Sequence, residues 1–284
     1  MPERWTAQDA GRVLRMPTDD DDKYSRGVLG VRTGSEQYPG AAVLGVEAAW
    51  RTGTGMVRYL GPERPSTLIL QRRPETVTAD GRVQAWLIGS GTDAASRSVD
   101  ETAALRGILS GDLTVVVDAG ALDLAPSGTA PRIVTPHGRE HTRLREALGL
   151  APLSAQPDEE ERADAAAETA AALGAVVLLK GAVTIVATPD GWSTRVQAGT
   201  PWLSTAGTGD VLGGVVGALA AAAGEDADAG ELGRVAATGA WLHGHAASLA
   251  ATAAAAGPDG SGPITALDVA EHLPAAVAAA LAAA

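Results

Sequence analysis

The chain has 284 residues, which is enough for one α/β domain with a single large core. Acidic residues outnumber basic ones by 34 to 22, and the formal net charge of -12 argues against a general nucleic-acid partner. Cysteine is absent, which excludes disulfides and thiolate metal sites and is compatible with a cytoplasmic location. The longest apolar run, Val211–Ala223, is shorter than the roughly 20 residues that span a bilayer, so we expect no membrane partner.

The chain begins with a polar segment. We predict a polar leader over residues 1–26, which includes the whole charge run Asp19–Lys23, and we expect this run to lie on the solvated surface. Residues 27–284 are predicted to form a single domain, because no segment in this range is typical of a long linker.

From Gly27 onward, short apolar runs alternate with helical patterns. The predicted strands are Val28–Val31, Met56–Leu60, Val83–Ile88, Leu113–Val117, Arg132–Thr135, Val176–Leu179 and Val183–Ala187. The predicted helices are Gly40–Arg51, Val99–Leu109, Arg139–Leu148 and Asp158–Leu173, followed by a mostly helical region from Asp210 to the end with a flexible break at Gly257–Pro263.

This order of elements predicts an α/β fold with helices on both faces of a central, mostly parallel sheet. The run Leu113–Val117 is apolar on successive residues, which is typical of a strand covered on both faces. The segment Thr188–Gly191 predicts a turn that joins Val183–Ala187 to Trp192–Val196 as a hairpin. Ligands are expected at the carboxyl ends of the parallel strands.

The clearest chemical motif is the glycine-rich segment Thr205–Gly214, TAGTGDVLGG, which runs directly into an apolar helix. Its glycines allow a tight turn in which backbone N–H groups face one point, and the helix adds its positive dipole there, so the motif predicts a phosphate site. A carboxylate beside phosphate would repel it unless a metal or a proton transfer requires the carboxylate. We therefore interpret Asp210 as a general base for a hydroxyl group, the alternative being an N-cap aspartate without chemistry.

Lys180 is one of only two lysines and directly follows the strand Val176–Leu179. It should therefore lie at the carboxyl edge of the sheet, where it could bind phosphate. The alternative is a lysine whose stem packs on the sheet edge while its ammonium extends into solvent and binds no ligand. The segments Gly89–Gly91 and Thr33–Ala42 are weaker signals that could equally be plain turns.

Two pairs of histidines invite a metal hypothesis. The string His137–His141, HGREH, matches an inverted zinc-protease pattern, but the proline before His137 and the glycine after it indicate that a helix has barely begun there. We therefore do not predict zinc at this string. His243 and His245 are two residues apart and face different sides of a helix, so we assign them core or surface roles.

The shared order of these motifs across the chain resembles the ADP- or ATP-dependent NAD(P)H-hydrate dehydratases, whose fold is the ribokinase-like three-layer α/β/α fold. The resemblance runs from about Lys23 to Leu249. Its elements are Lys23 with Gly27, GSEQYPGAA from Gly34, GSG from Gly89, VVVDAGAL from Val115, TPHGRE from Thr135, LLKGAVTIV from Leu178, TAGTGD from Thr205 and AWLHG from Ala240.

The resemblance implies a lyase that returns (6S)-NADHX and (6S)-NADPHX, hydrated on the nicotinamide ring, to NADH and NADPH. ADP or ATP would phosphorylate the ring hydroxyl, and loss of phosphate would restore the reduced dinucleotide. The implied catalytic residues are Asp210 as the base, with the amides of Gly207, Thr208 and Gly209 holding the transferring phosphoryl group. The implied nucleotide-binding residues are Lys180, Gly181, Ala182, Val183, Thr184 and Gly209. Those facing the hydrated dinucleotide are Ala41, Ala42, Gly91, His137 and Asp210.

The resemblance also implies Mg²⁺ bridging the phosphates, through ligands that these motifs do not identify. It implies a homo-oligomer of four or more copies, and a separate epimerase in the same pathway, because the residues before the match leave no room for an N-terminal epimerase domain. A ribokinase-like small-molecule kinase and a non-catalytic nucleotide-binding sensor remain as alternatives. The preferences between ADP and ATP, and between NADHX and NADPHX, stay open.

Overall fold

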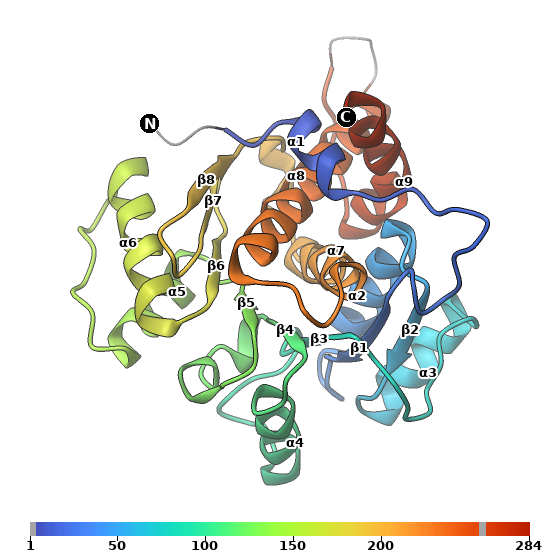
Figure 1. Ribbon diagram of the computed structural model, residues 1–284, viewed down its shortest axis with the longest axis horizontal. Helices are drawn as coiled ribbons and strands as arrows, with labels where there is room; N and C mark the ends of the chain where they lie inside the picture. The colour runs from blue at the N-terminus through green and yellow to red at the C-terminus, as the bar shows by residue number, and fades with distance from the viewer. Residues whose placement is uncertain (1–3, 256–259) are drawn as a thin grey trace.

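An eight-stranded sheet forms the centre of the molecule, in the order β2-β1-β3-β4-β5-β6-β7-β8 (Figure 1). The computed structural model describes residues 4–255 and 260–284, so part of the predicted break at Gly257–Pro263 lies outside it. The strands are β1 Val28–Arg32, β2 Met56–Tyr59, β3 Ala85–Ile88, β4 Thr114–Val117, β5 Arg132–Val134, β6 Val176–Leu179, β7 Thr184–Ala187 and β8 Ser193–Val196. Neighbours from β2 to β6 pair in parallel, whereas β7 is antiparallel to both β6 and β8. The mostly parallel sheet and the hairpin are therefore confirmed.

Helices cover both faces of this sheet. They are α1 Ala7–Val13, α2 Pro39–Thr52, α3 Glu63–Arg72, α4 Val99–Leu109, α5 Gly138–Ala147, α6 Glu159–Leu173, α7 Thr208–Ala223, α8 Ala229–Ala253 and α9 Ala266–Ala283. Alternating strand residues point to opposite faces. Val116 joins a core with α2, α7, α8 and α9, whereas Val115 and Val117 join a second core with α4, α5 and α6. Every residue of β4 is buried, because both of its faces are covered.

Two helices were not indicated by the sequence pattern. Helix α1 lies within the segment predicted as a polar leader; Thr6 caps it in a capping box with Asp9, and its buried residue Ala10 packs in the α8 and α9 core. Helix α3 is mostly exposed and buries only Pro65 and Ile69, so its apolar stripe is too short to recognise.

Helix α7 lies unusually close to α2 because both helices carry glycine at their contact. A Cβ on Gly214 would collide with the carbonyl oxygen of Gly45, and a Cβ on Gly217 would lie 3.1 Å from the Leu29 side chain below it. Twelve residues of α7 are buried, so the helix is enclosed by α2, α8 and the sheet. This packing fixes the position of the α7 N-terminus at the carboxyl edge of the sheet.

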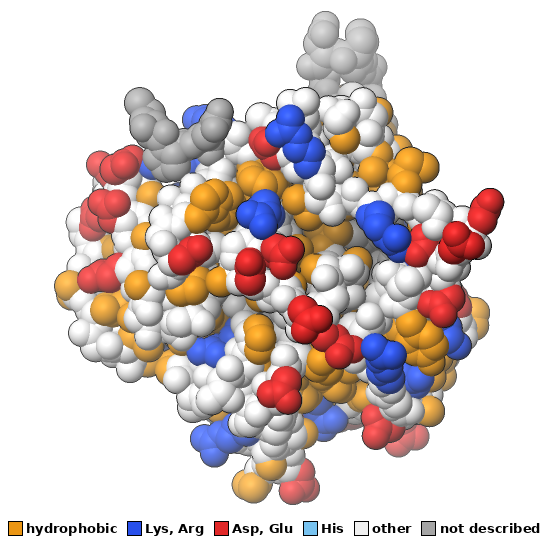
Figure 2. Space-filling view, in the orientation of Figure 1, with side chains coloured by type: hydrophobic (Ala, Val, Ile, Leu, Met, Phe, Trp, Pro, Cys, Tyr) orange, Lys and Arg blue, Asp and Glu red, His pale blue; other side chains and the backbone are white. Residues whose placement is uncertain are grey.

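Helix α9 is the one helix in the described ranges that is long and apolar enough to cross a membrane, judged by length and composition alone. Here it packs against α1, α2 and α8, and it buries Val269, Leu273 and Ala280 among other residues. Acidic and basic side chains are interspersed over the face of the molecule that Figure 2 shows.

Candidate active site

The carboxyl ends of neighbouring strands bring the predicted site residues to one edge of the sheet. The turn after β3 packs on the start of α2, since a Cβ on Gly91 would lie 2.5 Å from the Ala41 Cβ. Helix α2 in turn touches the first turn of α7: a Cβ on Gly45 would lie 3.5 Å from the backbone oxygen of Asp210. Ala41, Gly91 and Asp210 therefore belong to one neighbourhood, although they are far apart in the sequence.

A buried ion pair occupies this edge. Lys180 Nζ, directly after β6, lies 2.8 Å from Asp118 Oδ1, directly after β4. Asp118 also accepts hydrogen bonds from Thr135 Oγ1 at 2.7 Å and from Ser90 Oγ at 2.9 Å, so donors from the ends of three strands surround it. The Lys180 side chain is 20% exposed, so it is not a lysine that only reaches solvent.

Both members of this pair are held in their charged forms. Burial alone would raise the pKa of Asp118, but the Lys180 ammonium and three hydrogen bonds outweigh burial and lower it. Burial would lower the pKa of Lys180, but the carboxylates of Asp118, Glu140 and Asp210 raise it. Glu140 Oε2 lies 3.8 Å from Lys180 Nζ, so the lysine is the cation at the centre of three acidic side chains.

The glycine-rich segment forms an open helix N-terminus. Gly207 is the N-cap of α7 with φ of 89°, a conformation that favours glycine, and no side chain caps the helix. Thr208 Oγ1 donates to the carbonyl oxygens of Leu203 and Thr205, both at 3.0 Å, and so secures the turn. Asp210 is therefore a first-turn residue, and the N-cap alternative is wrong. An uncapped helix start presents backbone N–H groups that an anion can bind.

Asp210 faces this open N-terminus with an altered acidity. Burial, and next the negative charge of Asp118, raise the pKa of Asp210 to about 7, while Lys180 acts in the opposite direction. A Cβ on Gly209 would lie 3.7 Å from Lys180 Nζ, and one on Gly207 would lie 3.9 Å from Asp210 Oδ2. Three kinds of group thus lie close together: the Lys180 ammonium, the amides at the start of α7, and the Asp210 carboxylate, which can take up a proton near neutral pH. This combination suits phosphoryl transfer to a hydroxyl group.

We expect the pH dependence of catalysis to report this carboxylate. Below about pH 7, Asp210 of the free enzyme is protonated and cannot accept the proton of a hydroxyl group, so kcat/KM should fall about tenfold per pH unit and reach a plateau above pH 7. Steady-state rates between about pH 5.5 and 8.5 test this. Nucleotide affinity, measured in parallel, should not fall in acid, because neutral Asp210 repels phosphate less. A flat profile would contradict the base assignment.

The remaining predicted nucleotide contacts lie beside Lys180. Gly181 and Ala182 are exposed in the turn between β6 and β7, and Val183 and Thr184 lead into β7. Arg162 of α6 holds this turn, because its Nη1 donates to the Val183 carbonyl oxygen at 3.1 Å. The turn therefore presents its backbone at the same edge as the lysine.

The two histidines of the string His137–His141 belong to helix α5, one as its N-cap and one inside it. His137 is the N-cap, and its Nδ1 accepts hydrogen bonds from the backbone N–H groups of Arg139 and Glu140 at 3.1 and 3.4 Å. Its side chain is half exposed at the predicted substrate side. His141 is buried instead, with Nε2 2.9 Å from Thr169 Oγ1. Within residues 4–255 and 260–284, no three His, Cys, Asp or Glu side chains form a metal-binding group.

Sequence reasoning from the residues assigned no role to Asp118, Glu140, Ser90 or Thr135. Asp118 carried a usable signal, because it is a charged residue directly after the buried run of β4, as Lys180 is directly after β6. Glu140 is the third residue of α5 and completes its capping box, so its pattern indicated only a helix start.

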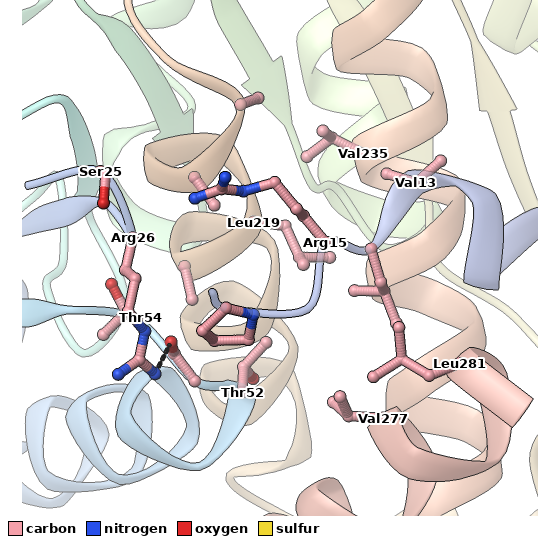
Figure 3. Close-up of a pocket in the computed structure, with 16 residues that line it drawn as sticks. Val13, Arg15, Ser25, Arg26, Thr52, Thr54, Leu219, Val235, Val277 and Leu281 are labelled. Carbon is pink, nitrogen blue, oxygen red and sulfur yellow. Dashed lines mark hydrogen bonds between the residues drawn. The ribbon is translucent and has the colours of Figure 1, made fainter. Parts of the chain in front are cut away.

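Two cavities flank the turn at Thr92 and Asp93 on the same edge. One, of about 380 Å³, is also lined by Gly34 and Tyr38; the other, of about 490 Å³, is also lined by Glu140. A third cavity, of about 210 Å³, lies at the far end of α7 (Figure 3). Its lining includes Val13, Leu219 and Leu281 but none of the predicted site residues, so we place the active site at the carboxyl edge.

The mostly parallel sheet covered by helices on both faces places the chain in the class of ribokinase-like α/β proteins, and the open start of α7 at its carboxyl edge could bind an anion. A profile of the NAD(P)H-hydrate dehydratase family matches residues 29–262. The chain therefore belongs to the NAD(P)H-hydrate dehydratase family.

Individual relatives agree with this assignment. The bifunctional NAD(P)H-hydrate repair enzyme of Mycobacterium leprae is 40% identical over 285 residues, covering 96% of this chain and 55% of the relative. The ADP-dependent (S)-NAD(P)H-hydrate dehydratase of Neisseria meningitidis is 35% identical, covering 84% of this chain and 81% of the relative. A Bacillus subtilis ADP/ATP-dependent NAD(P)H-hydrate dehydratase, co-crystallised with ATP/Mg²⁺, superposes with a TM-score of 0.80 at 27% identity, covering 97% of each chain. This chain spans about half the length of the bifunctional relatives it matches.

Proposed function

We propose that this chain catalyses the ADP- or ATP-dependent dehydration of (6S)-NADHX and (6S)-NADPHX to NADH and NADPH. The observation that carries the proposal is the Asp210 carboxylate, with its pKa raised to about 7, beside the uncapped N-terminus of α7 and near Lys180. The names of the relatives from Neisseria meningitidis and Bacillus subtilis support the substrate and the nucleotide requirement.

In the first step, Asp210 takes the proton of the ring hydroxyl while the hydroxyl oxygen forms a bond to the terminal phosphorus of the nucleotide. The bond from that phosphorus to the bridging oxygen breaks, and the nucleotide leaves with one phosphate fewer. The amides of Gly207, Thr208 and Gly209 hold the transferring group, and Lys180 neutralises its charge. In the second step, the carbon–oxygen bond breaks, phosphate leaves, and loss of a ring proton restores the double bond.

The carboxylates at this edge fit a magnesium ion that is shared with the nucleotide. Mg²⁺ commonly uses one or two carboxylates together with phosphate oxygens and water, which suits a site without a complete protein cage among the described residues. Glu140 is the best placed, because its carboxylate lies at the edge beside Lys180 and is not engaged in a short ion pair with it. When bound there, Mg²⁺ would offset the charge of the phosphates.

A kinase that phosphorylates a small hydroxyl compound and stops would use the same carboxylate and helix N-terminus. Membership of the dehydratase family favours the repair reaction over this alternative. A nucleotide sensor would not need Asp210 as a base, so a variant at this position separates the sensor from both enzymes.

The test is recovery of reduced-nicotinamide absorbance when the protein meets chemically hydrated NADH or NADPH with Mg²⁺. Parallel reactions contain ADP, ATP or no nucleotide. We expect recovery that requires a nucleotide and releases one phosphate per dinucleotide, and the faster nucleotide identifies the preferred donor. Binding of ADP or ATP without recovery would contradict the repair function.

Three further proposals rest on the family resemblance rather than on contacts in one chain. They are a homo-oligomer of four or more copies, a separate epimerase in the pathway, and a cytoplasmic location. Sedimentation of the purified chain tests the first, and an epimerisation assay on the purified chain tests whether that activity must come from elsewhere.

A further inference from the structure

A cavity of about 490 Å³ lies beside the proposed reaction centre, and the proposed mechanism gives it no ligand. Its wall includes Glu140, whose Oε2 atom is 3.8 Å from Lys180 Nζ. The rest of the wall comes from the segments that follow β3 and β4 and from α5, which follows β5. Because these three strands are neighbours in the sheet, the cavity extends from Lys180 along the carboxyl edge.

One face of α5 forms a side of this cavity. Glu140, Arg143, Leu144 and Ala147 all line it, and their spacing places them on the same side of the helix. Leu144 is buried in the core that α5 shares with α4 and α6, whereas Arg143 is exposed. The packing of α5 therefore holds Arg143 at the cavity wall, one turn of helix beyond Glu140.

Arg143 is the one basic residue among the described residues that line the cavity, which also carry the carboxylates of Asp93, Asp123 and Glu140. Asp123 is already paired, because its Oδ2 atom is 2.8 Å from Arg97 Nη2. The Arg143 side chain forms no hydrogen bond or ion pair within residues 4–255 and 260–284. Its guanidinium is therefore available to a ligand, and without it the carboxylates would repel an anion from this cavity.

The neighbouring cavity, of about 380 Å³, offers no such free cation. Its one basic lining residue among the described residues is Arg97, whose side chain is 4% exposed. The Arg97 guanidinium is fully engaged: it pairs with Asp123, donates to the Gly120 carbonyl oxygen, and donates from Nε to Thr102 Oγ1 at 3.1 Å. Arg97 therefore holds the protein together at this edge, whereas Arg143 is free to bind a ligand.

The diphosphate of the hydrated dinucleotide is an anion that needs a cation of its own, because Lys180 and the α7 amides are assigned to the transferring phosphoryl group. Gly91, which is predicted to face the dinucleotide, directly precedes Thr92 in the cavity wall. We propose that Arg143 binds the diphosphate of the hydrated dinucleotide in this cavity, an inference that rests on the proposed function. A guanidinium suits this task, because it can donate two parallel N–H bonds to phosphate oxygens.

Replacing Arg143 by Gln removes the charge and leaves a polar side chain on the helix. We expect the KM values for hydrated NADH and hydrated NADPH both to rise about 10- to 100-fold, the effect of losing hydrogen bonds between charged groups. The kcat should stay within about threefold of the wild type, because the diphosphate is bound equally well in the substrate and in the transition state. Arg143→Lys keeps the charge but cannot form two parallel bonds, so its KM values should lie between those of the wild type and Arg143→Gln.

Two binding measurements do not depend on turnover. NADH carries the same diphosphate, so its Kd, measured from nicotinamide fluorescence, should rise by the same factor in Arg143→Gln. The Kd of ADP with Mg²⁺, measured by calorimetry, should stay within about threefold of the wild type, because the ADP phosphates belong at Lys180 and α7. Arg106→Gln is the matched control: Arg106 is an exposed arginine on α4 that lines neither cavity, so all values should equal those of the wild type.

Wild-type values of the KM and of the NADH Kd in Arg143→Gln would overturn the inference, as would a loss of ADP binding in place of NADH binding. A KM that rises for hydrated NADPH alone would place Arg143 at the additional phosphate of that substrate and overturn the assignment to the diphosphate. A lower unfolding temperature in Arg143→Gln, with no recovery of NADH binding in Arg143→Lys, would also overturn it. A wild-type protein that binds NADH and ADP but repairs no hydrate would refute the proposed function and leave the NADH measurement to decide the role of Arg143.

Discussion

Replacing Asp210 by Asn is expected to lower turnover by about 10² to 10⁴ fold without disturbing the fold. Asn has almost the same shape, but it cannot accept the proton that the hydroxyl group must lose. The substitution also removes a carboxylate whose pKa is raised by burial and by Asp118, so the folded state should not be weakened. Single-turnover rates with hydrated NADH and saturating ADP measure the effect.

The accompanying binding measurement makes this result specific. ADP affinity should be equal or higher in Asp210→Asn, because a negative charge near the phosphates has been removed. Asp226→Asn, an exposed substitution in the connection between α7 and α8, serves as the control and should behave as the wild type. Turnover within a few fold of the wild type in Asp210→Asn would refute the role of the base.

Replacing Lys180 by Met is expected to damage both nucleotide binding and stability. The ammonium group pairs with Asp118, whose side chain is only 4% exposed, and removing it leaves a buried carboxylate supported by hydroxyl groups alone. Breaking a buried pair from one side costs about 3 to 5 kcal/mol, and we expect the lower value because Lys180 is 20% exposed. Urea unfolding at pH 7 and the KM for ADP measure the two effects, and the KM should rise at least tenfold.

A double variant separates the two roles of this lysine. In Lys180→Met with Asp118→Asn, the buried charge is gone, so most of the stability should return. The nucleotide KM should stay high, because the cation that faces the phosphates is still missing. If Lys180→Met alone keeps the stability and the KM of the wild type, then the ion pair has neither role.

The sheet could be predicted because its strands differ so clearly from their surroundings. The run at β4 is apolar on successive residues and is buried on both faces, as its pattern indicated. Helices α1 and α3 escaped the sequence pattern because each buries only two residues, which is too few to produce a periodic stripe. A clear periodic pattern of apolar residues requires a large buried face. Helices at the periphery bury little, so they are the elements that are hardest to predict from sequence.

Individual residues of the candidate site could be singled out from the sequence, but the ion pair between two of them could not. Asp210 and Lys180 could be singled out because each follows a recognisable local signal, a glycine-rich helix start and the end of a strand. The partner of Lys180 could not, because Asp118 is 62 residues away and meets it only when β4 and β6 lie on the two sides of β5. Local sequence indicates where a strand ends, whereas the order of strands decides which ends meet.

The glycine contact between α2 and α7 also has a meaning for protein engineering. Replacing glycine by alanine inside a helix is a common route to thermostability, worth up to about 1 kcal/mol through propensity alone. At Gly214 the added methyl group would strike the backbone of Gly45, and α7 would have to move away from α2. The first turn of the same helix carries Asp210 and the amides proposed to bind phosphate, so this movement of α7 would displace the proposed site and offset the gain in helix propensity. Substitutions chosen to stabilise this protein should therefore leave Gly214 unchanged.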